Sequence, residues 1–287
     1  MEITLKELLK RADEKKIAYA SFNAPNYESA LAVVQAAEEL RIPFILSHGP
    51  GHDCYTDIDH VIDIYKSITK NITVDYCFHL DHTSDLNYIE KALSLGFTSV
   101  MYDGSHESYE DNIKNTIQVV AMAKKYGAAV EAELGTVASS MYGKSETALS
   151  VNVSEYTDPL QAKDFVERTG IDFLAIAIGT VHGVYVTKPI LDLDRIRMIR
   201  DVVDIPLVLH GGSGIVDEDI LIAIENGIRK INYYTYLTLA GGEAVRKLIT
   251  SQDKLFFHDI SLAATEGMKQ DALRTMKLFS VRQNNSD

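Results

Sequence analysis

Short β-rich runs alternate with longer stretches of helical periodicity along the whole chain, and this alternation restricts the fold more than any other feature. Such alternation is typical of βα units on a parallel sheet. The runs FLAIAIG and PLVLHGG lack a polar–apolar alternation, as expected for strands buried on both faces. Eight strands are predicted: Ile17–Asn23, Pro43–His48, Val74–His82, Thr98–Gly104, Ala129–Gly135, Phe173–Gly179, Pro206–Gly212 and Lys230–Thr235.

The stretches between these runs carry apolar residues at i, i+3 and i+4 spacing, and several end in glycine, as helix C-caps do. Eight βα units at roughly 30-residue spacing fit a closed (β/α)8 barrel better than an open doubly wound sheet. We therefore expect an α/β protein with a TIM-barrel fold. Since no Pro/Ser-rich linker divides the 287 residues, residues 1–287 are expected to form one domain.

One connection departs from this rhythm. Residues 136–157 read TVASSMYGKSETALSVNVSEYT, a small and polar segment without a clear period. Loops longer than about 12–15 residues without structure of their own are usually lids or disordered. This loop follows the fifth predicted strand, so it should hang over the C-terminal face, where barrel enzymes carry their chemistry. We expect it to be an active-site loop.

Charge and hydropathy exclude several classes of function. The chain has 28 Lys and Arg against 41 Asp and Glu, a net charge of −13, and its cations are scattered, whereas nucleic-acid binders cluster theirs. No run reaches the roughly 18–20 apolar residues of a membrane span, and the N-terminus begins a charged helix rather than a signal peptide. Cys54 and Cys77 form no CxxC pair, which favours a reducing compartment. We expect a cytoplasmic protein that binds neither nucleic acid nor membranes.

Imidazoles and carboxylates gather at or just after the C-terminal ends of the predicted strands: His48, Asp81, His82, Asp103, Glu133, His182 and His210. In a closed barrel these positions converge on one mouth. Mixed nitrogen and oxygen donors suit a divalent metal of the zinc kind. Each residue alone has an ordinary reading, since a strand-end histidine is commonly a satisfied polar residue and Asp103 in YDGS could make a turn. Several such residues on different strand ends are hard to explain by chance.

Two glutamates and three loops add to this picture. Glu131 and Glu133 alternate with apolar residues, so both should point to one face, where a buried glutamate needs a partner. The segments HG at 182–183, HGGSG at 210–214 and NYYT at 232–235 should lie near the same mouth. In TIM barrels the loops after strands 7 and 8 commonly form the phosphate-binding site, so these segments indicate a phosphorylated ligand. Lys230 could add charge or merely cap its strand.

At these residues the sequence resembles the class II, zinc-dependent ketose-bisphosphate aldolases, which include the fructose- and tagatose-bisphosphate aldolases. The resembling segments are SFN at 21–23, HLDH at 79–82, SVMYDGSH at 99–106, EAELG at 131–135, YTDP at 156–159, GTVHG at 179–183, LHGGSG at 209–214 and KIN at 230–232. The resemblance implies a metal-dependent lyase that reversibly cleaves a phosphorylated ketose to dihydroxyacetone phosphate and an aldehyde. It also suggests a homodimer or homotetramer.

The resemblance further implies a role for each matching residue. His82, His182 and His210 would bind one catalytic Zn²⁺. Asp103 and Glu133 would supply a second or alternative position for a divalent metal. Asp81 would be the acid/base on the hydroxyl beside the cleaved bond, and His79 would support the site. Contacts to the phosphorylated sugar would come from Asn23, Gly183, Gly211, Gly212, Ser213, Asn232 and Thr235.

Two segments depart from the family's pattern. The loop after ELG usually carries an acidic GGxEDG-like stretch whose Glu moves a proton, but here it reads GTVASSMYGKSE, and Glu146 is one candidate substitute. Where the family has a small or acidic residue before the threonine after strand 8, this chain has Tyr234, which would fill space that a hexose bisphosphate needs.

These departures leave three readings open. The first is a zinc-dependent aldolase acting on a ketose 1-phosphate with a non-standard distal group, which could be deoxy, sulfonated or acidic. The second is an ordinary tagatose- or fructose-1,6-bisphosphate aldolase. The third is a catalytically weak sugar-phosphate-binding protein that has kept the metal-binding residues and lost proton transfer. Distal-end specificity separates the first two readings, and turnover separates both from the third.

Overall fold

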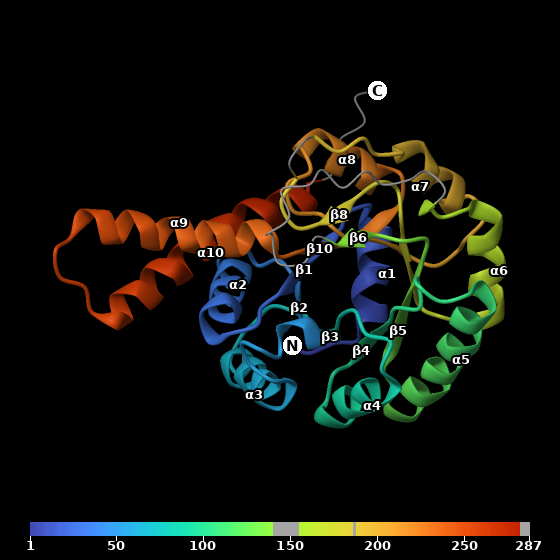
Figure 1. Cartoon of the computed structure of the whole chain (residues 1–287), viewed down its shortest axis with the longest axis horizontal. Coiled ribbons are helices and arrows are strands. Elements are labelled where there is room, and N and C mark those ends of the chain that lie inside the picture. The colour runs from blue at the N-terminus through green and yellow to red at the C-terminus, as the bar shows by residue number, and fades with distance from the viewer. Residues whose placement is uncertain (140–154, 186–187, 282–287) are drawn as a thin grey trace.

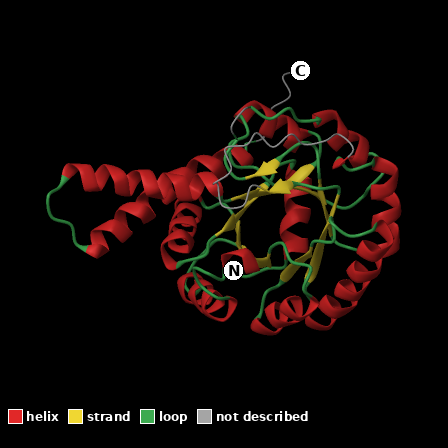
Figure 2. Ribbon diagram, in the orientation of Figure 1, coloured by secondary structure: helices red, strands yellow, loops and turns green. Residues whose placement is uncertain are grey.

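Eight parallel strands close into a barrel in the order β1-β10-β9-β7-β5-β4-β3-β2. The computed structural model describes residues 1–139, 155–185 and 188–281. Figure 2 shows the ring of strands enclosed by helices, and the expected TIM barrel is confirmed. The barrel strands are β1 (Tyr19–Asn23), β2 (Phe44–His48), β3 (Tyr76–Leu80), β4 (Ser99–Tyr102), β5 (Ala129–Leu134), β7 (Phe173–Ile176), β9 (Leu207–Leu209) and β10 (Ile228–Tyr233).

Helices follow the strands and cover the outside of the barrel (Figure 1). They are α2 (Tyr27–Leu40), α3 (Ile58–Thr69), α4 (Leu86–Leu95), α5 (Tyr109–Tyr126), α6 (Pro159–Thr169), α7 (Leu193–Arg200) and α8 (Asp217–Glu225), with the short 3-10 helix η1 (Pro50–His52) after β2. Several helices begin at an Asp, Asn or Ser side chain that accepts a backbone N–H of the first turn, for example Asp85 and Ser108. Among the described helices, none is long and apolar enough to cross a bilayer.

Helix α1 (Leu5–Lys15) closes the N-terminal end of the barrel. Its residues Leu5, Leu8 and Leu9 are fully buried and cluster with Cys77 and Phe173, which lie near the starts of their strands. The N-terminal end of the barrel is therefore filled with apolar side chains, and the polar interior lies toward the opposite, C-terminal end.

Side chains alternate along the strands between an apolar outer layer and a polar barrel interior. On β5, Val130 and Ala132 belong to the core between strands and helices. Glu131 and Glu133 are buried on the other face of the strand. Glu131 meets Lys230 of β10 inside the barrel at 2.9 Å. The predicted common face of the two glutamates is therefore confirmed.

Seven of the eight barrel strands are shorter than the predicted runs, and two short strands are new. The predicted strand Lys230–Thr235 starts earlier, at Ile228, and ends at Tyr233, because Thr235 already begins a helix. Strands β6 (Ala138–Ser139) and β8 (Val181–His182) pair with each other in parallel outside the barrel. Residues 140–154 of the expected active-site loop, with Glu146, lie outside the described residues.

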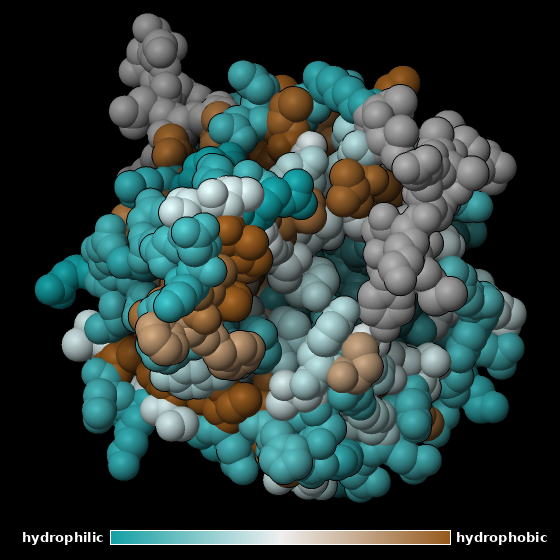
Figure 3. Space-filling model, turned by 60° about the vertical axis from the view of Figure 1, so that its left-hand side comes forward, coloured by the Kyte–Doolittle hydropathy of each residue, from teal (hydrophilic) through white to brown (hydrophobic). Residues whose placement is uncertain are grey.

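Two long C-terminal helices, α9 (Thr235–Ser251) and α10 (Phe257–Phe279), form an arm that projects past α2 (Figure 1). The two helices pack against each other, and α10 also packs against α2. Figure 3 turns this arm toward the viewer and shows apolar atoms gathered on it. Its exposed apolar side chains are Leu239, Ile249, Phe256, Phe257 and Leu262.

Candidate active site

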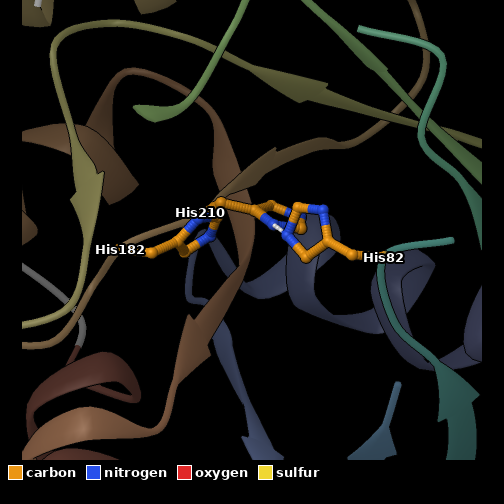
Figure 4. Close-up of side chains that lie close together, drawn as sticks. All are labelled: His82, His182 and His210. Carbon is orange, nitrogen blue, oxygen red and sulfur yellow. Dashed lines mark hydrogen bonds between the residues drawn. The ribbon is translucent and has the colours of Figure 1, made fainter. Parts of the chain in front are cut away.

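Three histidines from separate strand ends meet at the C-terminal mouth of the barrel. His82 follows β3, His182 ends β8, and His210 follows β9. One ring nitrogen from each lies within 4.8 Å of the others (Figure 4). Nε2 of His82 and Nδ1 of His210 face each other at 2.6 Å. The structure thus brings together the three residues that the sequence singled out as metal ligands.

The opposite ring nitrogens are held by carboxylates. Nδ1 of His82 lies 2.8 Å from Oδ2 of Asp103, and Nε2 of His210 lies 2.9 Å from Oε1 of Glu131. Because an ionised carboxylate only accepts hydrogen bonds, each of these nitrogens carries a proton. This arrangement fixes the rings and aims the other nitrogen of each histidine into the site, as carboxylates do behind metal-binding histidines.

The donor set fits a divalent cation of the zinc kind. Burial disfavours a charged His82, but Asp81 and Asp103 outweigh it and raise the pKa of the ring to about 10. A hydrogen bond between Nε2 of His82 and Nδ1 of His210 needs one proton between them, and a metal bound to both nitrogens would displace that proton. An imidazole cluster flanked by carboxylates is the ligand chemistry that zinc takes in proteins.

A second group of donors adjoins the first. His82, Asp103 and Glu133 also place one ligand atom each within 4.8 Å of one another. Glu133 is buried, and its Oε2 has no hydrogen-bond partner among the described residues. Burial and the neighbouring Asp103 raise the pKa of Glu133 to about 8. A buried carboxylate oxygen without a partner fits the second or alternative metal position expected from the sequence.

Asp81 lies beside the histidines and is held by two amides. Asn23 donates from Nδ2 to Oδ2 of Asp81 at 2.9 Å, and Asn232 donates from Nδ2 to Oδ1 at 3.0 Å. Burial alone would raise the pKa of the Asp81 carboxyl, but His82 and His210 hold it well below its usual range. Asp81 is therefore ionised, and each of its oxygens keeps a lone pair that can accept a further proton.

Glycine-rich backbone surrounds the same mouth. Gly211 has φ +69°, and a Cβ there would lie 2.5 Å from the carbonyl oxygen of Val181. The N–H of Gly212 donates to the carbonyl of Asn232 at 3.1 Å, and Ser213 Oγ accepts the N–H of Tyr234 at 3.1 Å. These bonds hold the loop after β9 against the loop after β10.

The remaining predicted substrate contacts lie on neighbouring loops. Gly183 follows β8 with φ +110°, and Thr235 is the first residue of α9. Tyr185 links β8 to the loop after β9, because its hydroxyl donates to the carbonyl of Gly211 and accepts the N–H of Val181, both at 3.0 Å. Backbone N–H groups of such loops and of a helix N-terminus are suited to hold an anion.

The sequence reasoning missed two parts of this mouth. Lys230 was expected to add charge near the phosphate-binding loops or to cap its strand, but it is fully buried in the barrel interior and its charge is paired with Glu131. Since Lys230 and Asn232 are two residues apart on one strand, the period of two could have placed both inside. His52 of η1 contacts Tyr234 with ring centroids 4.7 Å apart, and no sequence signal singled it out.

Comparison with known proteins gives a consistent result. The sequence matches the family described as Fructose-bisphosphate aldolase class-II over residues 3–284. The uncharacterized protein YdjI of Escherichia coli strain K12 is 41% identical over 269 residues, covering 93% of this chain and 94% of that protein. The crystal structure of the YdjI aldolase from E. coli K12 matches with a TM-score of 0.86 and 38% identity, covering 97% of both chains. Fructose-bisphosphate aldolase (Fba) from Campylobacter jejuni shares the fold, with a TM-score of 0.81 and 22% identity over 97% of this chain and 95% of that one.

Proposed function

The chain belongs to the class II fructose-bisphosphate aldolase family, and from this we propose that it is a zinc-dependent aldolase. It would cleave a phosphorylated ketose reversibly to dihydroxyacetone phosphate and an aldehyde. The observation that carries the proposal is the convergence of three ring nitrogens, from His82, His182 and His210, beside the ionised Asp81. We also propose that the chain forms one catalytic domain, because the barrel closes where β1, its first strand in the sequence, pairs with β10, its last.

The proposed zinc ligands are His82, His182 and His210, and Asp103 and Glu133 offer the second or alternative position. Zinc in such a site supplies a Lewis acid that stabilises the negative charge developing on the ketone oxygen during cleavage. Asp103 and Glu131 keep the rings of His82 and His210 in place. No lysine Schiff base is then needed.

Asp81 is the proposed acid/base. In cleavage its carboxylate would accept the proton of the hydroxyl beside the breaking bond, and in condensation it would return that proton to the aldehyde oxygen. The amides of Asn23 and Asn232 hold both carboxylate oxygens, which keeps the carboxylate in position for either direction. Asn23 and Asn232 are also proposed to contact the substrate.

The phosphate of the ketose is proposed to bind between the loops after β8, β9 and β10. The residues assigned to it are Gly183, Gly211, Gly212, Ser213 and Thr235. Backbone N–H groups, a serine hydroxyl and the N-terminus of α9 all favour an anion, while Gly212, whose N–H donates to the carbonyl of Asn232, holds its loop in place. Local donors can therefore hold a phosphate on a chain whose net charge is −13.

For the distal end of the sugar we propose a non-standard group, which could be deoxy, sulfonated or acidic. Tyr234 packs against His52 between the loops after β10 and β2, so aromatic side chains occupy space where the family has small residues. An ordinary tagatose- or fructose-1,6-bisphosphate aldolase remains the alternative within the same chemistry. The alternative without aldolase chemistry is a protein that binds sugar phosphates and does not turn them over.

Retro-aldol cleavage over a panel of ketose 1-phosphates with varied distal groups tests this proposal. We expect turnover of at least one member, loss of that turnover in EDTA, and its return when zinc is added back. Turnover confined to the two hexose bisphosphates would favour the ordinary aldolase. If zinc-loaded protein cleaves no member, the binding-protein alternative gains and the aldolase proposal fails.

We also propose that the protein is cytoplasmic and forms a homodimer or homotetramer. The arm of α9 and α10 is the proposed interface between subunits. Apolar side chains exposed together, such as Phe256 and Phe257 at its tip, commonly mark a protein interface. The double variant Phe256→Ser/Phe257→Ser is expected to lower the mass measured by light scattering toward the 31.9 kDa of one chain. The control Tyr126→Ser removes an exposed aromatic ring from α5 and should leave the mass unchanged. An unchanged mass in the double variant would exclude the arm tip from the interface.

A further inference from the structure

Lys230 is a fully buried lysine in the interior of the barrel. Its Nζ lies 2.9 Å from Oε2 and 3.1 Å from Oε1 of Glu131, and 2.7 Å from Oδ1 of Asn232. Nε2 of His79 lies at 3.4 Å. A buried ion pair rarely adds much stability compared with apolar residues of the same volume, so its presence calls for another reason.

The first consequence of Lys230 is the orientation of Asn232. An ammonium group only donates hydrogen bonds, so the amide atom that faces it must be the oxygen. The amide nitrogen of Asn232 then has to point the other way, and it donates to Oδ1 of Asp81. With the amide reversed, Asn232 would present its oxygen to the Asp81 carboxylate, which is repulsive.

The second consequence concerns His210. Lys230 and Glu131 form a buried ion pair, with Nζ 2.9 Å from Oε2 and 3.1 Å from Oε1 of the carboxylate. The ionised Oε1 accepts the proton of His210 Nε2. The neutral ring of His210 therefore keeps its lone pair on Nδ1, the nitrogen that faces His82.

We propose that Lys230 is a positioning residue that sets the direction of the hydrogen bonds on both sides of the active site. Through Glu131 it selects the tautomer of His210 that can bind a metal through Nδ1, and through Asn232 it presents an N–H to Asp81. The inference deepens the proposed aldolase function and rests on it for the roles of zinc and Asp81. The tautomer of His210 can be measured without either.

The tautomer test uses apo protein labelled with ¹⁵N in histidine and a long-range ¹H–¹⁵N spectrum. The His210 signals are assigned by their absence in His210→Ala. The wild-type protein should show His210 as a single Nε2–H form. The double variant Lys230→Met/Glu131→Gln removes both charges together, and its neutral amide can either donate or accept, so both tautomers should be populated. A single Nε2–H form in the double variant would overturn the proposal.

The metal test compares zinc affinity by chelator competition. We expect Lys230→Met/Glu131→Gln to bind zinc about 10–100-fold more weakly, the usual effect of removing a partner behind a metal-binding histidine. At saturating zinc, kcat should fall because Asn232 is no longer held, whereas KM should change less. The control Lys91→Met breaks an exposed ion pair with Asp59 on the outer helices and should change neither quantity.

Folding must be separated from positioning. Lys230→Met alone leaves Glu131 buried without its ammonium partner, which is strongly destabilising, so this single variant can fail to fold. The double variant avoids the uncompensated charge. If it folds with a cooperative thermal transition and keeps wild-type zinc affinity and kcat, Lys230 is structural only. If wild-type protein cleaves no ketose while the two proteins still differ in tautomer, the proposed function fails and the positioning role of Lys230 stands.

Discussion

Replacing His82 with alanine is expected to remove bound zinc and aldolase activity together. His82 belongs to both groups of metal donors, the one with His182 and His210 and the one with Asp103 and Glu133. Its loss leaves two histidines in one group and two carboxylates in the other, and neither is the three-ligand set of a catalytic zinc site. The measurement is zinc per chain by mass spectrometry, together with retro-aldol rate on the best substrate of the panel.

The matched control is His60→Ala. His60 lies on α3 with 76% of its side chain exposed and contacts Asp57, so its loss should change neither zinc content nor rate. Because Asp81 and Asp103 lose the ring that faces them, His82→Ala is expected to be less stable than apo wild type, so zinc content and rate should be measured well below its thermal transition. Full zinc content with full turnover in His82→Ala would remove His82 from the metal site.

The fold could be predicted because strands buried on both faces are apolar runs and the helices between them are periodic. The ends of the strands could not be predicted as well. The run Val74–His82 contains β3, which ends at Leu80, although the backbone N–H of Asp81 still donates to the carbonyl of His48 at the end of β2. Polar residues that follow a strand look the same in sequence whether they continue it or leave it.

The projection of the arm formed by α9 and α10 could not be predicted from the sequence for another reason. Pattern reasoning assumes that apolar residues are buried, and the arm breaks this assumption with Phe256 and Phe257 at its tip. Periodicity can propose two helices at 235–251 and 257–279, but it carries no information on whether they lie on the barrel or project from it.

At the C-terminal mouth, residue types at strand ends were enough to predict that the histidines, Asp81, Asp103 and Glu133 come together. The contact between Glu131 and Lys230 was not predictable, because β5 and β10 are separated by β7 and β9 around the barrel and meet only across its interior. Spacing along the chain shows which face a side chain takes. It does not show which side chain from a distant strand it will meet there.

Asp81→Ala is expected to separate chemistry from metal binding. The variant should keep zinc, because the donor groups do not include Asp81. Its retro-aldol rate should fall by roughly 10²–10⁴, the usual contribution of a positioned general base. KM should change less than kcat, since the proton moves only as the bond breaks.

The amides of Asn23 and Asn232 lose their acceptor in Asp81→Ala, so some loss of stability is also expected, about 1–3 kcal/mol for each buried donor left unpaired. Rates should therefore be measured well below the thermal transition. Asp59→Ala is the control, because Asp59 is exposed on α3 and its only described ion pair is with Lys91. A rate near that of wild type in Asp81→Ala would show that the proton leaves through another group, whereas loss of zinc would mean that Asp81 also holds the metal site together.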